Sequence, residues 1–304
     1  MPAEIVGIGA NVYDTLIVLP HYTEEDKKQR AVSVSAAGGG PCATGLVAAA
    51  KLGASAAFLG CVSADGAGQF LLEDFARYGV DTTGVSALPG YRAFTSYVML
   101  SQETTSRTIV FDKGNLPPLV LGEGQKAAIR EAKVLLVDGN ELDAAIEGAK
   151  LARASGTAVV YDAGGRYEGV KGLLPYADYL IPSEEFALGE SGEEDAAAAA
   201  VKLYETYHPR VVVITQGSRG GMFYDGKTLK TYPAMPATVV DSNGAGDVFH
   251  GAYAAAIAGG MEPYRACLFS SAVSALKCEK IGSRAGVPNH QTTISFLKEQ
   301  GYEF

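Results

Sequence analysis

The chain has 304 residues, a formal net charge of −9 and a hydrophobic fraction of 47%, so it can bury a sizeable core in one large domain or two small ones. Its acidic balance argues against a nucleic-acid-binding surface. The four cysteines form no Cys-x-x-Cys pair, which argues against a zinc site or a disulfide framework and favours a reducing, cytoplasmic location.

No secretory signal is expected, because residues 1–10 contain Glu4 and no basic cluster. The longest uncharged run, residues 31–50, is about as long as a membrane span. Its glycines, proline and serines instead favour a strand, a loop and a helix. We therefore expect no contact with a membrane.

Short apolar runs alternate with helical patterns along most of the chain. Strands are predicted at residues 5–10, 57–62, 134–137, 158–161, 179–181 and 211–215. Helices are predicted at residues 44–51, 69–78, 143–154, 195–207 and, as an uncharged and buried segment, 248–261. This alternation predicts βαβ units and a mostly parallel sheet, in which ligands gather at the carboxyl ends of the strands. One crevice is then expected to collect Gly9, Asp162, Gly217 and the loop before Asp247.

Two segments, at about residues 14–36 and 91–113, interrupt this rhythm. Each contains an alternating run, at residues 30–35 and 94–100, which is typical of antiparallel strands. Residues 108–111 are predicted to return as the partner of the second run. These segments predict either simple surface hairpins or a small separate sheet.

The stretch from Asp241 to Asp247 carries the most informative chemistry. Gly244, Ala245 and Gly246 precede the predicted helix at 248–261, so their N–H groups and the helix dipole favour a bound phosphate. Asp247 would repel that phosphate, but it is well placed to take a proton from a hydroxyl that attacks it. The same spacing also occurs in ordinary glycine-rich loops that lead into an acidic helix start.

This stretch resembles the C-terminal signature of the ribokinase-like, or PfkB, carbohydrate kinases, Asp-Thr-x-Gly-Ala-Gly-Asp, with Ser242 in the Thr position. Residues 39–44 and 48–53 resemble the family's Gly-Gly-x-x-x-Asn motif and its Ala-x-Leu-Gly helix. Residues 60–82 are similar to a further family run that ends in Gly-Val-Asp-Thr. The resemblance is collinear over nearly all 304 residues.

The resemblance implies a ribokinase-like α/β fold, in which a mostly parallel sheet between helices forms one domain over residues 1–304. It also implies that the segments at 14–36 and 91–113 form a small β-sheet lid. In this family the lid closes over the sugar and often mediates dimerisation, so a homodimer through the lid is expected.

The acceptor pocket is expected near the first strand and the lid. By resemblance, Asp14 binds sugar hydroxyls, and the backbone of Gly39 and Gly40 faces the sugar; a lone Asp after a strand is also a common turn former. Asn11 follows the first strand beside Asp14, and Thr44 replaces the usual Asn with a shorter side chain. Three further candidates remain. Arg107 lies on the lid, where it suits either a contact with the acceptor or a position in solvent, and Asn140 and Arg166 follow predicted strands.

The nucleotide is expected at a second glycine-rich turn. Thr215, Gly217 and Gly220 resemble the family's Thr-x-Gly-x-x-Gly turn, which lets ATP approach the backbone closely. Glycine-rich turns of this kind are common, so the turn alone is weak evidence. The adenine side is implied to be lined by small residues, namely Ala272, Ala275, Gly282 and Gly286.

Magnesium should accompany ATP and neutralise charge in the transition state. The family often holds it through an Asn-x-x-Glu motif, but here Ser183 and Phe186 replace the Asn and the Glu. Two alternatives remain: Glu184 or Glu185 substitutes in a shifted register, or the phosphates and Asp241 hold the hydrated metal. The resemblance also suggests a potassium-like ion beside the anion site, with oxygens from Asp241 and Asn243.

The sequence therefore predicts an ATP-dependent sugar kinase in which Asp247 is the general base and residues 244–246 form the anion hole. The expected acceptor is a ketohexose such as fructose or a related sugar, with ribose next. A sugar phosphate or another anionic sugar stays open, because the lid segments carry Lys27, Lys28, Arg30, Arg92 and Arg107. A nucleoside kinase is a further alternative, because nucleoside recognition requires aromatic stacking on the lid. The candidate residues for such stacking are Tyr13, Tyr91, Phe94 and Tyr97. A sugar-sensing regulator without catalysis is the alternative of another class, and the retained Asp247 argues against it.

Overall fold

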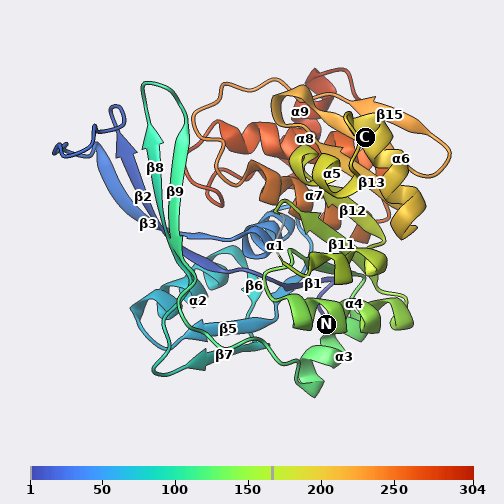
Figure 1. Ribbon diagram of the computed structural model, residues 1–304, viewed down its shortest axis with the longest axis horizontal. Helices are drawn as coiled ribbons and strands as arrows, with labels where there is room; N and C mark the ends of the chain where they lie inside the picture. The colour runs from blue at the N-terminus through green and yellow to red at the C-terminus, as the bar shows by residue number, and fades with distance from the viewer. Residues whose placement is uncertain (1, 166–167) are drawn as a thin grey trace.

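A nine-stranded sheet forms the centre of the computed structural model, which describes residues 2–165 and 168–304. The spatial order of the strands is β15-β14-β13-β12-β11-β10-β1-β4-β6 (Figure 1). All pairs from β13 to β6 are parallel, while β14 and β15 add an antiparallel edge. In chain order the strands are β1 (Ile5–Ile8), β4 (Ala56–Phe58), β6 (Val80–Asp81), β10 (Val134–Val137), β11 (Ala158–Ala163), β12 (Tyr179–Pro182), β13 (Val211–Thr215), β14 (Gly221–Tyr224) and β15 (Leu229–Tyr232).

Helices cover both faces of this sheet, which is why its central strands are almost entirely apolar. Ile5 of β1 points into one core cluster and Val6 into the other, as expected when successive side chains alternate. The first cluster is closed by α1 (Pro41–Lys51), α2 (Gly66–Tyr78), α7 (Ala245–Ala258), α8 (Pro263–Cys278) and α9 (His290–Glu299). The second is closed by α3 (Glu123–Glu131), α4 (Leu142–Ser155), α5 (Glu184–Ser191) and α6 (Ala196–Tyr207).

Membrane insertion finds no support in these helices. Within the described part of the chain, none is both long enough and apolar enough to cross a bilayer.

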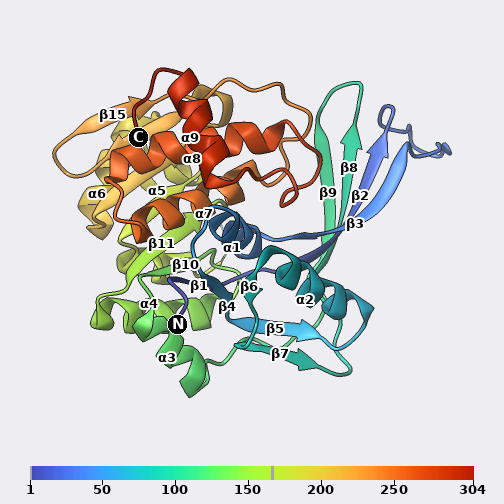
Figure 2. The same cartoon turned by 180° about the vertical axis from the view of Figure 1, so that it is seen from behind.

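The lid is a separate four-stranded sheet that projects from the sandwich (Figure 2). It consists of β3 (Ser33–Gly39), β2 (Val12–Leu19), β8 (Thr95–Ser101) and β9 (Arg107–Asp112), in this spatial order. The pairs β2–β3 and β8–β9 are antiparallel, which confirms the predicted return strand at 108–111. The two hairpins are joined by a parallel β2–β8 pair, which brings Asp14 beside Ser96. The alternating pattern alone did not indicate this parallel junction.

The single strand predicted at residues 57–62 is wrong. The main-sheet strand β4 ends at Phe58, and β5 (Gly60–Ser63) pairs instead with β7 (Val85–Leu88) in a small sheet of its own. The N–H of Leu59 still donates to the carbonyl of Gly7 at 2.9 Å. At Gly60 a Cβ atom would lie 2.6 Å from the ring of Phe58, so only glycine lets the chain turn away here. The apolar run in the sequence continues through this turn, so the sequence pattern does not indicate where β4 ends.

Candidate active site

The N-terminus of α7 forms the centre of the candidate site. Gly244 precedes the helix with φ 74°, a left-handed conformation that favours glycine, and no side chain caps the first turn. A Cβ atom at the exposed Gly246 would meet no neighbouring atom within 4 Å, so the space above this turn is open. Backbone N–H groups and the helix dipole make such a helix start attractive to an anion. The predicted position of Gly244, Ala245 and Gly246 at a helix N-terminus is confirmed, but the helix spans Ala245–Ala258 and not the predicted 248–261, so Ala245 and Gly246 form part of its first turn.

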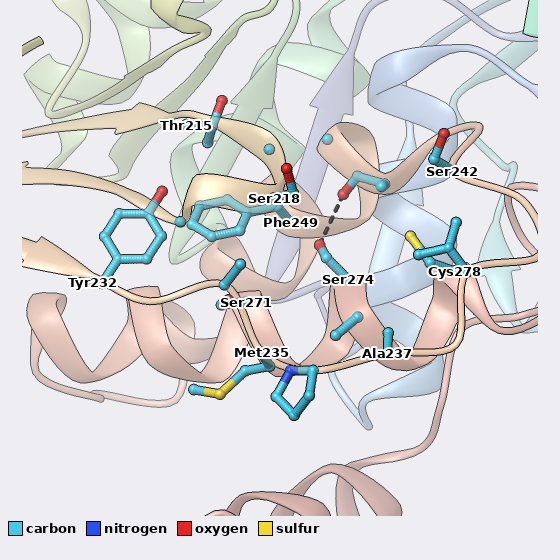
Figure 3. A pocket seen from close by; sticks show the side chains of 18 residues that line it. Thr215, Ser218, Tyr232, Met235, Ala237, Ser242, Phe249, Ser271, Ser274 and Cys278 are labelled. Carbon is cyan, nitrogen blue, oxygen red and sulfur yellow. Dashed lines mark hydrogen bonds between the residues drawn. The ribbon is translucent and has the colours of Figure 1, made fainter. Parts of the chain in front are cut away.

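Two cavities meet at this helix start. Ala245 and Gly246 line a cavity of about 490 Å³ between β13, the β15–α7 connection and α8 (Figure 3). Gly244 and Asp247 line a second cavity of about 290 Å³ beneath the lid. The first turn of α7 is therefore a wall that both cavities share.

Asp247 is half-buried at this wall. Burial raises its pKa to about 7; the carboxylates of Asp162 and Asp138 add to this shift, whereas His250 opposes it. A carboxylate with a raised pKa holds a proton more firmly than an ordinary aspartate does. A general base that works near neutral pH needs a raised pKa of this kind.

Asp14 lies on the lid side of the smaller cavity. Its Oδ1 accepts a hydrogen bond from Ser96 Oγ at 2.6 Å. A Cβ atom at position 39 would collide with Asp14 Oδ2, so Gly39 is needed for the close approach of β3 to this carboxylate. Burial raises the pKa of Asp14 to about 6, and the Ser96 bond and Arg284 oppose the shift.

The predicted acceptor residues that the structure describes divide into three groups. Those that line the smaller cavity are Asp14, Gly39, Gly40, Arg107 and Asn140. Asn11 lies beside it, lines a neighbouring cavity of about 420 Å³ and accepts a hydrogen bond from Arg284 Nη2 at 3.0 Å. Thr44 is fully buried on α1 and lines neither cavity, because this helix packs tightly against α7. Arg166 lies outside the described residues.

Arg107 connects the lid to the loop that leads into α7. Its Nη1 donates to Ser242 Oγ at 3.0 Å, and the guanidinium lines the smaller cavity. The hydroxyl at position 242 therefore has a structural partner on the lid. The other basic lid residues of the sequence prediction, Lys27, Lys28, Arg30 and Arg92, are not among the described residues that line this cavity.

The larger cavity contains part of the predicted nucleotide set. Thr215, Gly217, Gly220 and Ala275 line it, and Tyr232 stacks on Phe249 at its wall with centroids 5.8 Å apart (Figure 3).

Three other predicted adenine-side residues do not line this cavity. Ala272 is fully buried in the core, and Gly282 donates its N–H to Asp241 Oδ2 at 2.8 Å. A Cβ atom at Gly286 would lie 2.6 Å from the carbonyl oxygen of Lys277, which indicates a packing role.

Residues 221–228 match the Gly-x-x-x-x-Gly-Lys-Thr spacing of a P-loop. In the structure this segment is β14 and its turn into β15. It forms an antiparallel hairpin and leads into no helix, whereas a P-loop connects a strand to a helix. The match is therefore coincidental.

The predicted metal ligands do not fit a magnesium ion held by the protein. Glu185 is exposed and lines neither cavity, and the adjacent Glu184 binds Gln216 at 2.7 Å and Arg219. Asp241 Oδ1 accepts the N–H of Asn243, and Oδ2 accepts the N–H of Gly282, both at 2.8 Å. The described residues contain no cluster of three or more metal-binding side chains.

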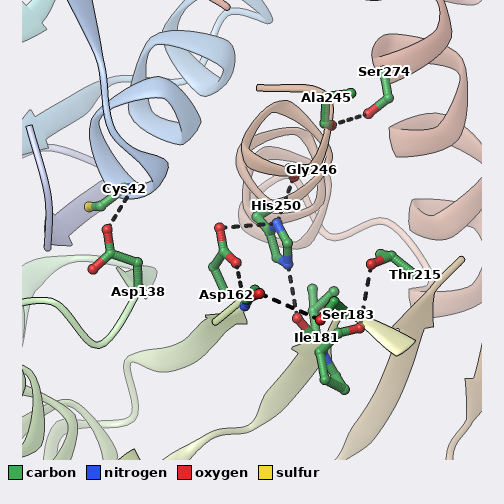
Figure 4. Close-up of polar contacts among 12 residues, drawn as sticks. Cys42, Asp138, Asp162, Ile181, Ser183, Thr215, Ala245, Gly246, His250 and Ser274 are labelled. Carbon is green, nitrogen blue, oxygen red and sulfur yellow. Dashed lines mark hydrogen bonds and ion pairs between the residues drawn. The ribbon is translucent and has the colours of Figure 1, made fainter. Parts of the chain in front are cut away.

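His250 ties the first turn of α7 to the sheet. Its Nδ1 lies 2.6 Å from the carbonyl of Gly246 and 3.2 Å from Asp162 Oδ2, and its Nε2 lies 2.9 Å from the carbonyl of Ile181 (Figure 4). Burial lowers the pKa of His250, and the two carbonyl contacts oppose that shift. The sequence analysis did not single out this residue, although it lies one helical turn after Gly246.

Buried charges also hold the acceptor side in place. Asp138 follows β10 and accepts the N–H groups of Ala10 at 2.8 Å and Cys42 at 3.0 Å, which fixes the loop after β1 to the start of α1. Arg284 pairs with Asp74 at 2.7 Å and donates to the carbonyl of Gly39. The position of Asp138 after a predicted strand was a usable signal. Nothing in the local sequence marked Arg284.

Comparison with known proteins shows the family to which the chain belongs. A model of the pfkB family carbohydrate kinases matches residues 4–290. Ribokinase of Haemophilus influenzae is 25% identical over 301 residues, which cover 96% of this chain and 97% of that protein.

Solved structures of similar fold cover nearly the whole chain. The structure of a putative ribokinase from Agrobacterium tumefaciens superimposes with a TM-score of 0.91 at 27% identity, covering 100% of both chains. Arabidopsis thaliana ribokinase, solved with ribose and ATP, superimposes with a TM-score of 0.86 at 23% identity, covering 98% of this chain and 99% of that one. The chain belongs to the pfkB family of carbohydrate kinases.

Proposed function

We propose that this kinase transfers the γ-phosphoryl group of ATP to a hydroxyl of a free sugar at the first turn of α7. The observation that carries the proposal is that this turn lines both cavities. The amides of Gly244, Ala245 and Gly246 stabilise charge on the transferred group, and Asp247 takes the proton of the attacking hydroxyl. The reaction belongs in the cytoplasm, where ATP is supplied.

ATP occupies the larger cavity in this proposal. Its adenine lies against small and apolar side chains that include Ala275, and its phosphates run past the Gly217–Gly220 turn towards α7. A magnesium ion bound with ATP would supply charge neutralisation in the transition state. No protein ligand for it is proposed, because Asp241 already binds two backbone N–H groups.

The sugar occupies the smaller cavity beneath the lid. Asp14 and Asn140 offer hydrogen-bond acceptors for hydroxyls, and Asn140 also offers donors. We propose ribose or a ketohexose such as fructose as the acceptor. The ribokinase relatives support ribose, whereas the sequence analysis placed the ketohexose first.

An anionic acceptor is the second candidate. Arg107 and Lys113 both line the smaller cavity, so a sugar phosphate or an acidic sugar bound there would lie near two cationic side chains. Such an acceptor would be recognised by its charge in addition to its hydroxyls.

We also propose a homodimer through the outer face of the lid. Tyr97 and Val110 are register partners there, and they and Val34 are 51–62% exposed. Ser96 and Phe111, the chain neighbours of Tyr97 and Val110, line the smaller cavity, so Tyr97 and Val110 face the opposite way. Val34 shares their face, because its register partner Ile17 pairs with Met99, two residues after Tyr97. Sedimentation equilibrium of the wild type and of Val110→Asp tests this: we expect a dimer that the charge weakens. A monomeric wild type at micromolar concentration would contradict it.

An ADP-release screen with magnesium ATP tests the kinase proposal. The panel contains free aldoses and ketoses, their phosphates, acidic sugars and nucleosides, each with the wild type and Asp247→Asn. Turnover of a free sugar that is lost in the variant is the expected result. Turnover of a sugar phosphate or an acidic sugar alone would establish the anionic alternative. Silence across the panel, with ATP still protecting the protein from thermal unfolding, would favour a regulator over an enzyme.

A further inference from the structure

Lys277, near the end of α8, is a buried cation that the proposed reaction has not yet used. Its side chain is 0% exposed. Its Nζ donates to the carbonyl oxygens of Asp241, at 2.8 Å, and of Asn243, and it lies 4.0 Å from Asp241 Oδ2. An ammonium group loses several kcal/mol of hydration when it is buried, so it is found inside proteins only where oxygens replace the lost water.

These contacts lie directly behind the anion hole. Asn243 and Gly244 line the acceptor cavity, and Gly244 caps α7. In a trans peptide the carbonyl of one residue and the N–H of the next point in opposite directions. By holding the carbonyl of Asn243, Lys277 turns the N–H of Gly244 away from itself. It therefore helps set the direction of an amide in the anion hole.

The oxygens that Lys277 occupies are those that the sequence analysis assigned to a potassium-like ion. Both carbonyls accept from Nζ, and both carboxylate oxygens of Asp241 accept backbone N–H groups. A potassium ion bound by Asp241 and Asn243 would have to displace the ammonium from a fully enclosed position. The described residues thus do not fit a separate monovalent cation at this place.

We propose that the Lys277 ammonium is a built-in replacement for a monovalent activating cation. It orients the 241–244 loop and keeps a fixed positive charge behind the anion hole, where it favours the charge of the transferred phosphoryl group. Phosphoryl transfer by this chain is therefore independent of potassium. This inference rests on the proposed phosphoryl transfer, and Lys277 acts as a positioning residue because it does not touch the substrate.

The test compares K⁺, NH₄⁺ and tetramethylammonium chlorides at equal ionic strength, with two readouts: turnover and melting temperature. For the wild type we expect both to change little between K⁺ and tetramethylammonium. Lys277→Met keeps most of the side-chain length but removes the charge. Its turnover in tetramethylammonium should fall by about 10–100-fold, less than for a lost direct oxyanion donor. K⁺ or NH₄⁺ should restore part of the turnover and raise its melting temperature.

Lys280→Met is the matched control, because Lys280 is exposed three residues further on. It should behave as the wild type in every salt. A merely structural role for Lys277 predicts a less stable variant with no preference among the cations, so the selective rescue separates the two roles.

Three results would overturn the proposal: a wild type that potassium activates several-fold, a wild type whose melting temperature potassium raises specifically, or a fully active Lys277→Met in tetramethylammonium. If the variant fails to fold, the wild-type salt profile still decides. Failure of the kinase proposal would give a different result from failure of this inference, because no salt would then support ADP release. The melting temperatures would still show whether a cation binds in place of the Lys277 ammonium.

Discussion

The two cavities that meet at α7 differ in the kinds of residue that line them. The smaller cavity, where the sugar is proposed to bind, presents polar side chains such as Asp14 and Asn140, held in place by buried groups beneath the lid. The larger cavity, where ATP is proposed to bind, is lined by glycine turns, small residues and an aromatic pair, Tyr232 and Phe249.

This difference matches what each ligand offers. Sugar hydroxyls differ only in direction, so recognising them requires fixed hydrogen-bonding partners. A purine base offers a large flat surface, which shape and apolar contact can hold. We infer that substitutions on the lid side change the choice and affinity of the sugar, whereas substitutions on the α8 side change the affinity for ATP. Substitutions at the shared wall should change the chemistry itself.

The largest effect is expected at the shared wall. Asp247→Asn keeps the size of the side chain but removes the base, so turnover should fall by about 10²–10⁴-fold. The affinity for ATP, measured by thermal protection or calorimetry, should be unchanged. A variant with near-normal turnover would refute the role of Asp247 as the base.

Asp14→Ala tests the acceptor side. Losing a charged hydrogen-bond acceptor costs about 1.5–3 kcal/mol, so the KM for the sugar should rise by about 10–100-fold. The KM for ATP should stay constant. Asp112→Ala is the control, because Asp112 is an exposed lid carboxylate. If the effect of Asp14→Ala fell on ATP instead, the assignment of the two cavities would be reversed.

The pH dependence of kcat/KM should reflect both Asp247 at the start of α7 and Asp14 beneath the lid. Asp247 must be ionised to accept a proton, and burial raises its pKa to about 7. The value of kcat/KM should therefore fall about 20-fold from pH 8 to pH 6, about tenfold from protonation of Asp247 and about twofold from Asp14, whose pKa burial raises to about 6. Below pH 6 it should fall more steeply, because both carboxylates are then largely protonated. A rate that is flat or rising towards pH 6 would contradict this account.

Ala275→Leu tests the nucleotide side and should have the smallest effect. The larger side chain projects into the cavity where ATP is proposed to lie. Its steric cost of about 1 kcal/mol should raise the KM for ATP about fivefold and leave the KM for the sugar unchanged. Ala275→Ser adds a single oxygen and is the matched control. Equal effects on both substrates would mean that the cavities are not independent.

The sequence predicted the mostly parallel sheet and the helix start at residues 244–247 because both depend on local patterns. Apolar runs located β10 and β13, and the glycines before an apolar helix located the start of α7. The parallel β2–β8 pair joins segments about 80 residues apart, and no local pattern specifies such a partner.

The buried residues that hold the site in place were also hard to predict, because their partners lie far away in the sequence. Arg284 contacts Gly39 across 245 positions, and Lys277 contacts Asp241 across 36. A charged residue in a loop or at a helix end normally lies in solvent, so its burial shows only in three dimensions. Thr44 and Ala272 show the opposite error, because a family motif indicated a ligand contact where packing against neighbouring helices buries the side chain.

The most direct test of the two-cavity account is a crystal structure with a non-hydrolysable ATP analogue and the acceptor found by the screen. We expect the adenine beside Ala275, the terminal phosphate at the amides of residues 244–246, and the attacking hydroxyl within hydrogen-bonding distance of Asp247. A sugar bound in the larger cavity, or a phosphate chain that avoids the start of α7, would contradict the account.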